Sequence, residues 1–288
     1  MKKFAFFPGC VLEGSAKEAL DATIKVAAAL EIELVELPGW TCCGASHVQD
    51  MDPMAALAIN ARNMALAEKM GLPILTVCNT CTLMLRQAKS ALDGDDRLKE
   101  KVNRVIASGG YEYVGFSDIT HLLWVLAEDT AFWQRRITRP LTGTKVAAYY
   151  GCHILRPQKI MNFEDSANPR SLETVIRAVG AEPVDFPDKL QCCGFHAFWT
   201  AEKDAVFLTG KHVDNAVKAG ADMMATPCPL CQMQLDMYQP EGRQAVHSTA
   251  EIPVLHLAQL IGLGLGFSPA ELGINRHVSA ASKVMLNQ

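Results

Sequence analysis

The sequence predicts an α/β fold of two pseudo-symmetric domains, each a small, mostly parallel sheet with flanking helices. Three observations support this prediction. The cysteines repeat one order twice, short apolar runs alternate with helix-like segments, and each cysteine group follows the end of an apolar run. The chain has 288 residues, enough for two domains of roughly 140 residues that can each bury a core.

The cysteine repeat is the strongest signal in the sequence. Each half carries a single cysteine, then Cys-Cys-Gly, then Cys-x-x-Cys, and none of the 10 cysteines is left over. The adjacent pair lies 35 positions before the Cys-x-x-Cys in both halves, while the first gap is 32 positions in one half and 40 in the other. The two sets are Cys10, Cys42, Cys43, Cys78 and Cys81, and Cys152, Cys192, Cys193, Cys228 and Cys231.

Short apolar runs precede these cysteine groups and have the character of buried strands. In chain order they occupy residues 4–7, 34–37 and 71–77 in the first half, and 146–150, 183–186 and 220–227 in the second. Because ligands of open parallel sheets bind at the carboxyl ends of the strands, three loops in each half would bring five thiols to one edge.

Helical patterns connect the strands. Residues 16–30, 52–70 and 202–218 carry apolar residues three and four apart, and the last two segments end at Gly71 and Gly220, as helices often do. The segment 130–144 contains Pro140 and Gly143 without a clear apolar period. The sequence therefore predicts a junction near residue 142, with domains at 1–142 and 143–288.

Composition limits the function classes. A net charge of -4 argues against a nucleic-acid binder. The apolar run after Lys3 ends at Pro8, too early for a signal sequence, and the run from Ile252 to Phe267 is too interrupted for a membrane span. We therefore expect a cytoplasmic protein that is not transmembrane. Thiols stay reduced in that compartment, which disfavours disulfides and favours metal binding.

Five thiols in each half exceed the needs of the common metal sites. Zinc takes four ligands, and so does a cubane iron–sulfur cluster. A fifth thiolate suggests an opened cluster in which one cysteine bridges two irons, and adjacent cysteines can reach different irons. The residues favour an iron–sulfur cluster in at least one half, with zinc in one half as an alternative.

The repeated pattern resembles the cysteine-rich C-C-G domain family, and the chain as a whole resembles the B subunit of heterodisulfide reductase and its bacterial relatives. The matching segments are 7–10, 40–44, 150–153, 191–194 and 226–231, with the likeness continuing to the helix near His256. The resemblance implies two non-cubane [4Fe-4S] clusters, one on each five-cysteine set. In some relatives the first motif is a zinc site, so it also leaves zinc possible in place of the N-terminal cluster.

The resemblance also implies an activity and partners. We expect a heterodisulfide-reductase-like iron–sulfur oxidoreductase subunit that cleaves or forms a disulfide of a small substrate between the two clusters. No nucleotide-binding motif occurs, so electrons must come from other polypeptides: a ferredoxin-like iron–sulfur C subunit and a flavoprotein A subunit. The Gly-rich apolar segment from Ile261 to Phe267 and the tail after Pro269 are candidates for that contact.

Two other functions stay open. The chain also resembles the C-C-G subunit of certain succinate dehydrogenases and fumarate reductases, an electron-transfer or anchor subunit that passes electrons to quinone without cleaving a disulfide. A non-enzymatic zinc or iron–sulfur interaction module is the third possibility, which two complete motifs disfavour.

Histidines beside the cysteine groups are candidate proton donors for release of the product thiols. His153 follows Cys152, while His196 and His47 follow the two Cys-Cys-Gly sequences. His121 and His256 occupy matching positions at predicted helix starts, where a structural role is expected. Trp124, Phe132 and Trp133 are expected to pack at the domain junction.

Overall fold

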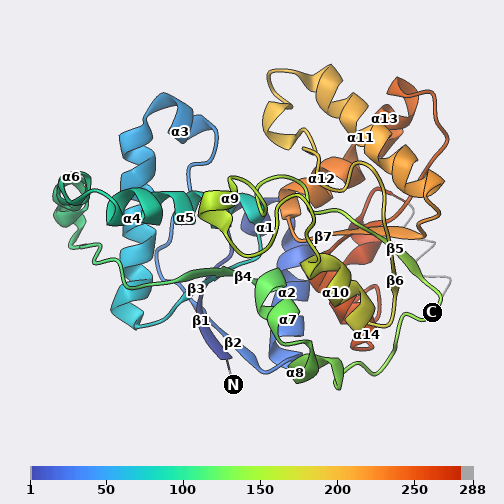
Figure 1. Ribbon diagram of the computed structural model, residues 1–288, viewed down its shortest axis with the longest axis horizontal. Coiled ribbons are helices and arrows are strands. Elements are labelled where there is room, and N and C mark those ends of the chain that lie inside the picture. The colour runs from blue at the N-terminus through green and yellow to red at the C-terminus, as the bar shows by residue number, and fades with distance from the viewer. Residues whose placement is uncertain (1, 280–288) are drawn as a thin grey trace.

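The structure, a computed structural model that describes residues 2–279, contains two parallel four-stranded sheets with helices packed on their faces (Figure 1). The predicted α/β class and the duplication are confirmed. The strand order is β2-β1-β3-β4 in the first sheet and β6-β5-β7-β8 in the second, so the two sheets have identical topology. All neighbouring strands in both sheets are parallel.

The first half contains four strands, eight α-helices and one 3-10 helix. They are β1 (Lys2–Phe7), α1 (Cys10–Gly14), α2 (Lys17–Ala29), β2 (Ile32–Glu36), α3 (His47–Met51), α4 (Pro53–Met70), β3 (Ile74–Thr76), α5 (Asn79–Asp93), α6 (Asp96–Ile106), η1 (Ala107–Gly109), β4 (Ile119–His121), α7 (Leu122–Glu128) and α8 (Thr130–Gln134).

The second half repeats the strands but shortens several helices. Its described elements are β5 (Lys145–Ala148), α9 (Gln158–Met161), α10 (Ser171–Ala178), β6 (Glu182–Val184), η2 (Phe195–Ala197), α11 (Glu202–Lys218), β7 (Met223–Thr226), α12 (Pro229–Met237), α13 (Gln239–Ala245), β8 (Val254–His256), α14 (Leu257–Gly264) and η3 (Ile274–Arg276).

Local sequence signals explain where the long helices begin and end. Asp52 caps α4 by accepting a hydrogen bond from the Ala55 amide at 3.0 Å, and Pro53 occupies the first turn, where its missing N–H costs nothing. The helix ends at Gly71 in the left-handed conformation (φ 65°). Helices predicted at 16–30, 52–70 and 202–218 thus appear as α2, α4 and α11 with shifts of at most two residues.

His121 and His256 have the structural role expected of them. Each ends the last strand of its sheet and caps the helix that follows, because its Nδ1 accepts a backbone N–H from the first turn of α7 or α14. Both side chains are fully buried. The pKa of His121 falls to about 3, chiefly because burial disfavours the imidazolium, and burial also lowers the pKa of His256.

The two halves share their hydrophobic core. Helix α2 packs on α14 and α7 packs on α10, so these four helices lie together between the two sheets (Figure 1). Trp124 and Trp133 are buried there, with Phe132 packed against them. The Trp124 ring stacks on Phe163 of the second half, with 5.0 Å between ring centroids. The aromatic residues predicted at the junction do pack between the halves.

Part of the segment predicted to contact a partner lies inside the protein. Residues Ile261 to Gly264 are buried in α14, against Leu272 and the helices of the first half, while residues 265–267 are at least partly exposed, so the predicted contact is limited to these and to exposed positions of the tail. The apolar character of this segment reflects a core helix enclosed on all sides. In the tail after Pro269, Leu272 and Ile274 are also buried, and residues 280–288 lie outside the described part.

Within residues 2–279, no helix combines the length and apolar character needed to cross a bilayer.

Candidate functional site

All ten cysteines lie at the carboxyl ends of the strands. In each sheet the order in which the strands are connected reverses between the two central strands, and an open α/β sheet binds its ligands at such a switch point. Cys10 follows β1, while Cys78 and Cys81 follow β3, so the first half presents three thiols beside its switch point. The loop after β2 adds Cys42 and Cys43, and the second half repeats this arrangement after β5, β6 and β7.

The N-terminal thiols form one close group. The Sγ atoms of Cys10 and Cys42 are 3.4 Å apart, and those of Cys43 and Cys81 are 3.7 Å apart. The Gly44 amide donates a hydrogen bond to the Cys42 sulfur at 3.4 Å. All ten cysteines are free of disulfide bonds in this structure.

Glycines let the backbone approach these thiols closely. Gly9 has φ 82°, and a Cβ atom there would lie 2.9 Å from the Cys81 sulfur. Gly151 occupies the matching place in the second half, with φ 70° and a Cβ position 3.0 Å from the Cys231 sulfur. The Gly-Cys sequence after each central strand therefore serves the packing of the thiol group.

The two thiol groups meet across the interface between the halves. The Sγ atoms of Cys78 and Cys228, which are 150 residues apart in sequence, lie 4.0 Å apart. Both side chains are buried. The duplication thus places two five-cysteine sets at one location rather than at opposite ends of the molecule.

The proton affinities of the thiols reflect this crowding. Hydrogen bonding from Cys10 and then from Cys43 lowers the pKa of Cys42 to about 2, and Cys152 and Cys193 do the same for Cys192. The same contacts, with burial, raise the pKa of Cys10 and of Cys152. Burial opposes ionisation of Cys228, but hydrogen bonds from Cys231 and Cys78 lower its pKa as well, so the second set favours two thiolates and the first set one. Ionising all five requires a compensating positive charge, which bound iron supplies.

The donor set fits an iron–sulfur cluster. Five sulfurs are gathered in each half, and thiolates are the ligands that iron–sulfur clusters use.

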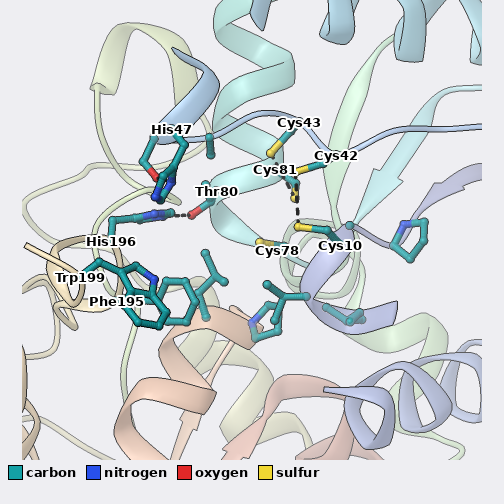
Figure 2. A pocket seen from close by; sticks show the side chains of 18 residues that line it. Cys10, Cys42, Cys43, His47, Cys78, Thr80, Cys81, Phe195, His196 and Trp199 are labelled. Atoms are coloured by element: carbon teal, nitrogen blue, oxygen red, sulfur yellow. Dashed lines mark hydrogen bonds between the residues drawn. The ribbon is translucent and has the colours of Figure 1, made fainter. Parts of the chain in front are cut away.

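A cavity of about 130 Å³ opens beside the N-terminal thiols. All five N-terminal cysteines line it, together with residues of the second half, including Phe195, His196, Trp199 and Leu230, but none of the C-terminal cysteines does. Figure 2 shows the sulfurs on one side of the cavity and His47, His196 and Trp199 on the other. Most of the lining surface is apolar, so a bound molecule would lose much of its contact with water.

The three predicted histidines all come close to this cavity. His47 and His196 line it, and His153 reaches it through Thr80. The Thr80 hydroxyl contacts His153 Nδ1 at 2.9 Å and His196 Nε2 at 3.2 Å, so two histidines of the second half meet one hydroxyl of the first. Burial lowers the pKa of His153 and of His196. Both rings are therefore neutral at pH 7 and able to accept a proton.

Sequence reasoning missed Thr80 and Trp199. Thr80 is an unspecified position within Cys-x-x-Cys, and the matching residue of the second half is Leu230, so the repeat itself did not mark it. Trp199 lines the cavity although 81% of its surface is exposed. A tryptophan close after Cys-Cys-Gly was the available signal for it.

Comparison with known proteins gives a consistent result. The model of the cysteine-rich CCG domain family matches residues 4–86 and again residues 146–236. The chain is 49% identical to the 8-methylmenaquinol:fumarate reductase membrane anchor subunit of Wolinella succinogenes, over 98% of this chain and 99% of that one. It is 36% identical to the B subunit of the ferredoxin:CoB-CoM heterodisulfide reductase of Methanosarcina mazei, over 96% and 94% respectively.

Among solved structures, a hypothetical protein from Helicobacter pylori has the same fold. The TM-score is 0.78 at 15% identity, with 96% of this chain aligned to 52% of that one. The chain thus spans about half of that protein, and the likeness concerns the fold alone.

Proposed function

The chain belongs to the cysteine-rich CCG domain family, which includes the B subunit of heterodisulfide reductase, and we propose that it is an iron–sulfur oxidoreductase subunit performing two-electron chemistry where its halves meet. The observation that carries this proposal is the 4.0 Å approach of Cys78 and Cys228, which joins two complete five-cysteine sets into one site. A subunit that only relayed single electrons would not need two such sets face to face.

The family implies iron–sulfur clusters, and each five-cysteine set would hold one of them, as a non-cubane [4Fe-4S] cluster. When bound, such clusters supply one-electron transfer, so two of them match the electron count of a two-electron reaction. The protein residues bind and orient the reactant. Apolar walls that include Phe195 and Leu230 exclude water from it, while His47, His153 and His196 hold or accept protons at the cavity.

The first candidate reaction is cleavage or formation of a disulfide. It is supported by the paired cysteine sets and by the relatives named as B subunits of heterodisulfide reductases. A cleaved disulfide yields two thiolates that need two protons, and the histidines at Thr80 are placed to relay them.

The second candidate is electron exchange with a quinol or quinone, as in a fumarate reductase or succinate dehydrogenase type complex. Two observations favour it: the 49% identity to a subunit named for 8-methylmenaquinol:fumarate reductase, and a largely apolar cavity that only the N-terminal set lines. An apolar ring could enter this cavity and exchange electrons with one set alone.

In either case the chain would act within a larger complex. We propose an iron–sulfur partner subunit of the ferredoxin type and a flavoprotein subunit, in keeping with relatives named as subunits of ferredoxin-dependent enzymes. We further propose that the complex faces the cytoplasm, and that the boundary between the two repeats lies near residue 142, between α8 and β5.

Anaerobic purification followed by iron and zinc quantification and EPR tests these proposals. About eight irons for each chain, with little zinc, are expected if both sets hold [4Fe-4S] clusters. A signal that changes with added thiol supports the disulfide reaction, and one that changes only with a reduced menaquinone analogue supports the quinol reaction. One cluster together with one zinc would contradict the two-cluster proposal.

A further inference from the structure

Cys78 lies between two residues that are both hydrogen-bonded to the opposite half of the molecule. The carbonyl of Val77 contacts Nε2 of His256 at 3.1 Å. On the other side, the Asn79 side-chain amide donates to the carbonyl of Tyr150 at 2.8 Å. Both contacts are buried, so water does not compete for them. The second half therefore holds the backbone on each side of this cysteine.

The tautomer of His256 follows from its own contacts. Its Nδ1 accepts the Ala258 amide at 3.3 Å at the start of α14, so in the neutral ring the proton is on Nε2. That N–H donates to the Val77 carbonyl. One nitrogen of the ring caps a helix of the second half, and the other fixes the strand end that presents Cys78 in the first half.

The matching cysteine of the second half is held less firmly. Cys228 lies between Pro227 and Pro229, and Pro229, which matches Asn79, has no side-chain donor. His121 matches His256 and caps α7 with its Nδ1; the Pro227 carbonyl lies close enough to offset part of the lowering of its pKa, but among the described residues its Nε2 makes no hydrogen bond of normal geometry. The Asn79 backbone also contacts the Cys228 sulfur. Contacts therefore cross the interface in both directions, and the contact of His256 with Val77 is the better formed of the two histidine contacts.

We propose that His256 is a positioning residue for the N-terminal thiol group. It holds the Val77 carbonyl, and this contact, which forms only when the two halves pack together, directs the Cys78 thiol toward the other four N-terminal cysteines. Asn79 completes this hold from the other side. The inference rests on the proposed function only where Cys78 is treated as a cluster ligand. The placement of the thiol itself can be measured without any cluster.

A pair of matched variants tests the placement of the thiol. His256→Asn keeps a side-chain oxygen that can cap α14, since asparagine is a good N-cap, but is too short to reach Val77. His121→Asn makes the same change in the first half, where only the looser approach of the ring to the Pro227 carbonyl is lost. In the iron-free full-length chain, iodoacetamide should alkylate Cys78 about fivefold faster in His256→Asn, the effect of losing one buried hydrogen bond. Cys193, which is buried like Cys78 and has Cys192 and Cys231 as its thiol neighbours, serves as the internal reference.

Cluster retention provides the second measurement. In a Cys192→Ala/Cys193→Ala background, which keeps only the N-terminal set, His256→Asn should release iron to a chelator about fivefold faster and alter the EPR signal. His121→Asn should change neither. His256→Gln, whose longer amide can approach the Val77 carbonyl, should restore slow alkylation and slow release.

Three results would overturn the inference: equal alkylation of Cys78 in His256→Asn and in the parent, a parallel rise at Cys193, or an equally large response in His121→Asn. A chain that binds no iron in any form would instead contradict the proposed function. The alkylation of Cys78 would still decide whether His256 positions this thiol.

Discussion

The two halves hold the same five cysteines in the same order, yet their surroundings differ. The N-terminal set opens into the cavity, and the C-terminal set does not. Thr80 of the first half meets two histidines, whereas Leu230, its counterpart, is one of the apolar residues of the cavity wall. The repeat therefore fixes the placement of the thiols, while residues between and beside them decide which set meets a reactant.

Removing the adjacent cysteines of each half should have the largest effect. We expect Cys42→Ala/Cys43→Ala and Cys192→Ala/Cys193→Ala each to lower iron from about eight to about four per chain. Because only the N-terminal set lines the cavity, the first variant should also lose the EPR response to substrate, while the second keeps part of it. Loss of the response in both variants would show that the two sets contact the substrate equally.

Acidification should destabilise the iron-free chain steeply. Burial lowers the pKa of His121, His153, His196 and His256, so the unfolded chain binds more protons than the folded one below pH 6.5. The free energy of unfolding is fully retained above the pKa of histidine in the unfolded chain. It decreases as the pH falls below that value, by up to about 1.4 kcal/mol per pH unit for each histidine that stays neutral in the folded chain. Urea unfolding between pH 7 and pH 5 measures this slope. His121→Asn should make the slope shallower, and an unchanged slope would contradict a neutral buried His121.

Alanine at the Gly-Cys turns should affect both halves alike. Gly9→Ala and Gly151→Ala each place a Cβ atom about 3 Å from a sulfur at a positive φ, and we expect each to cost about 1–2 kcal/mol of stability. Gly143→Ala is the control, because Gly143 has φ 79° with no atom within 4 Å of the added carbon. Thermal unfolding gives all three values. If Gly9→Ala and Gly151→Ala cost no more stability than Gly143→Ala, the cysteine sulfurs move away from the added carbon easily.

Loss of the Thr80 hydroxyl should affect only the interface. Thr80→Val removes the contact with His153 and His196 at nearly constant volume, and we expect a loss of about 1 kcal/mol in the free energy of unfolding. The pKa values of both histidines, followed by NMR, should change together. Thr200→Val, at an exposed hydroxyl that contacts only its own turn, is the control. Independent titration of the two histidines in the parent would contradict a shared contact.

The smallest stability change is expected at the mouth of the cavity. Trp199→Ala removes an exposed ring, so the free energy of unfolding should change by less than about 0.5 kcal/mol. Binding of a disulfide or quinol should nevertheless weaken, because Trp199 lines the cavity. Isothermal titration measures the affinity, and unchanged affinity would exclude a role for Trp199 in binding.

Much of the fold could be predicted because the two halves of the sequence can be aligned with each other at their cysteines. The strand ends before Cys10, Cys78 and their counterparts were visible as apolar runs, and parallel order then placed the thiols at one edge. The contacts of Thr80 and Asn79 were not predictable. Their partners lie 71 or more residues away, and the packing of the two halves, which includes α5 on α9 as well as α2 on α14 and α7 on α10, brings them together.

Within the segment 261–267, which was predicted to contact a partner, residues 261–264 are buried in the chain's own core, and the prediction now concerns only the residues after them. Strong hydrophobicity marks a buried surface, but the sequence does not say whether the covering partner is another chain or another part of the same one. Here the covering residues include Leu272 of the same chain.

The covalent joining of the two repeats has a consequence for how the site can diversify. In a homodimer of a single repeat, any substitution would appear on both sides of the interface at once, so a threonine at one side would require a threonine at the other. Fusion removes this constraint. Position 80 can carry a hydroxyl that contacts two histidines across the interface, while position 230 carries an isobutyl group that forms part of the cavity wall.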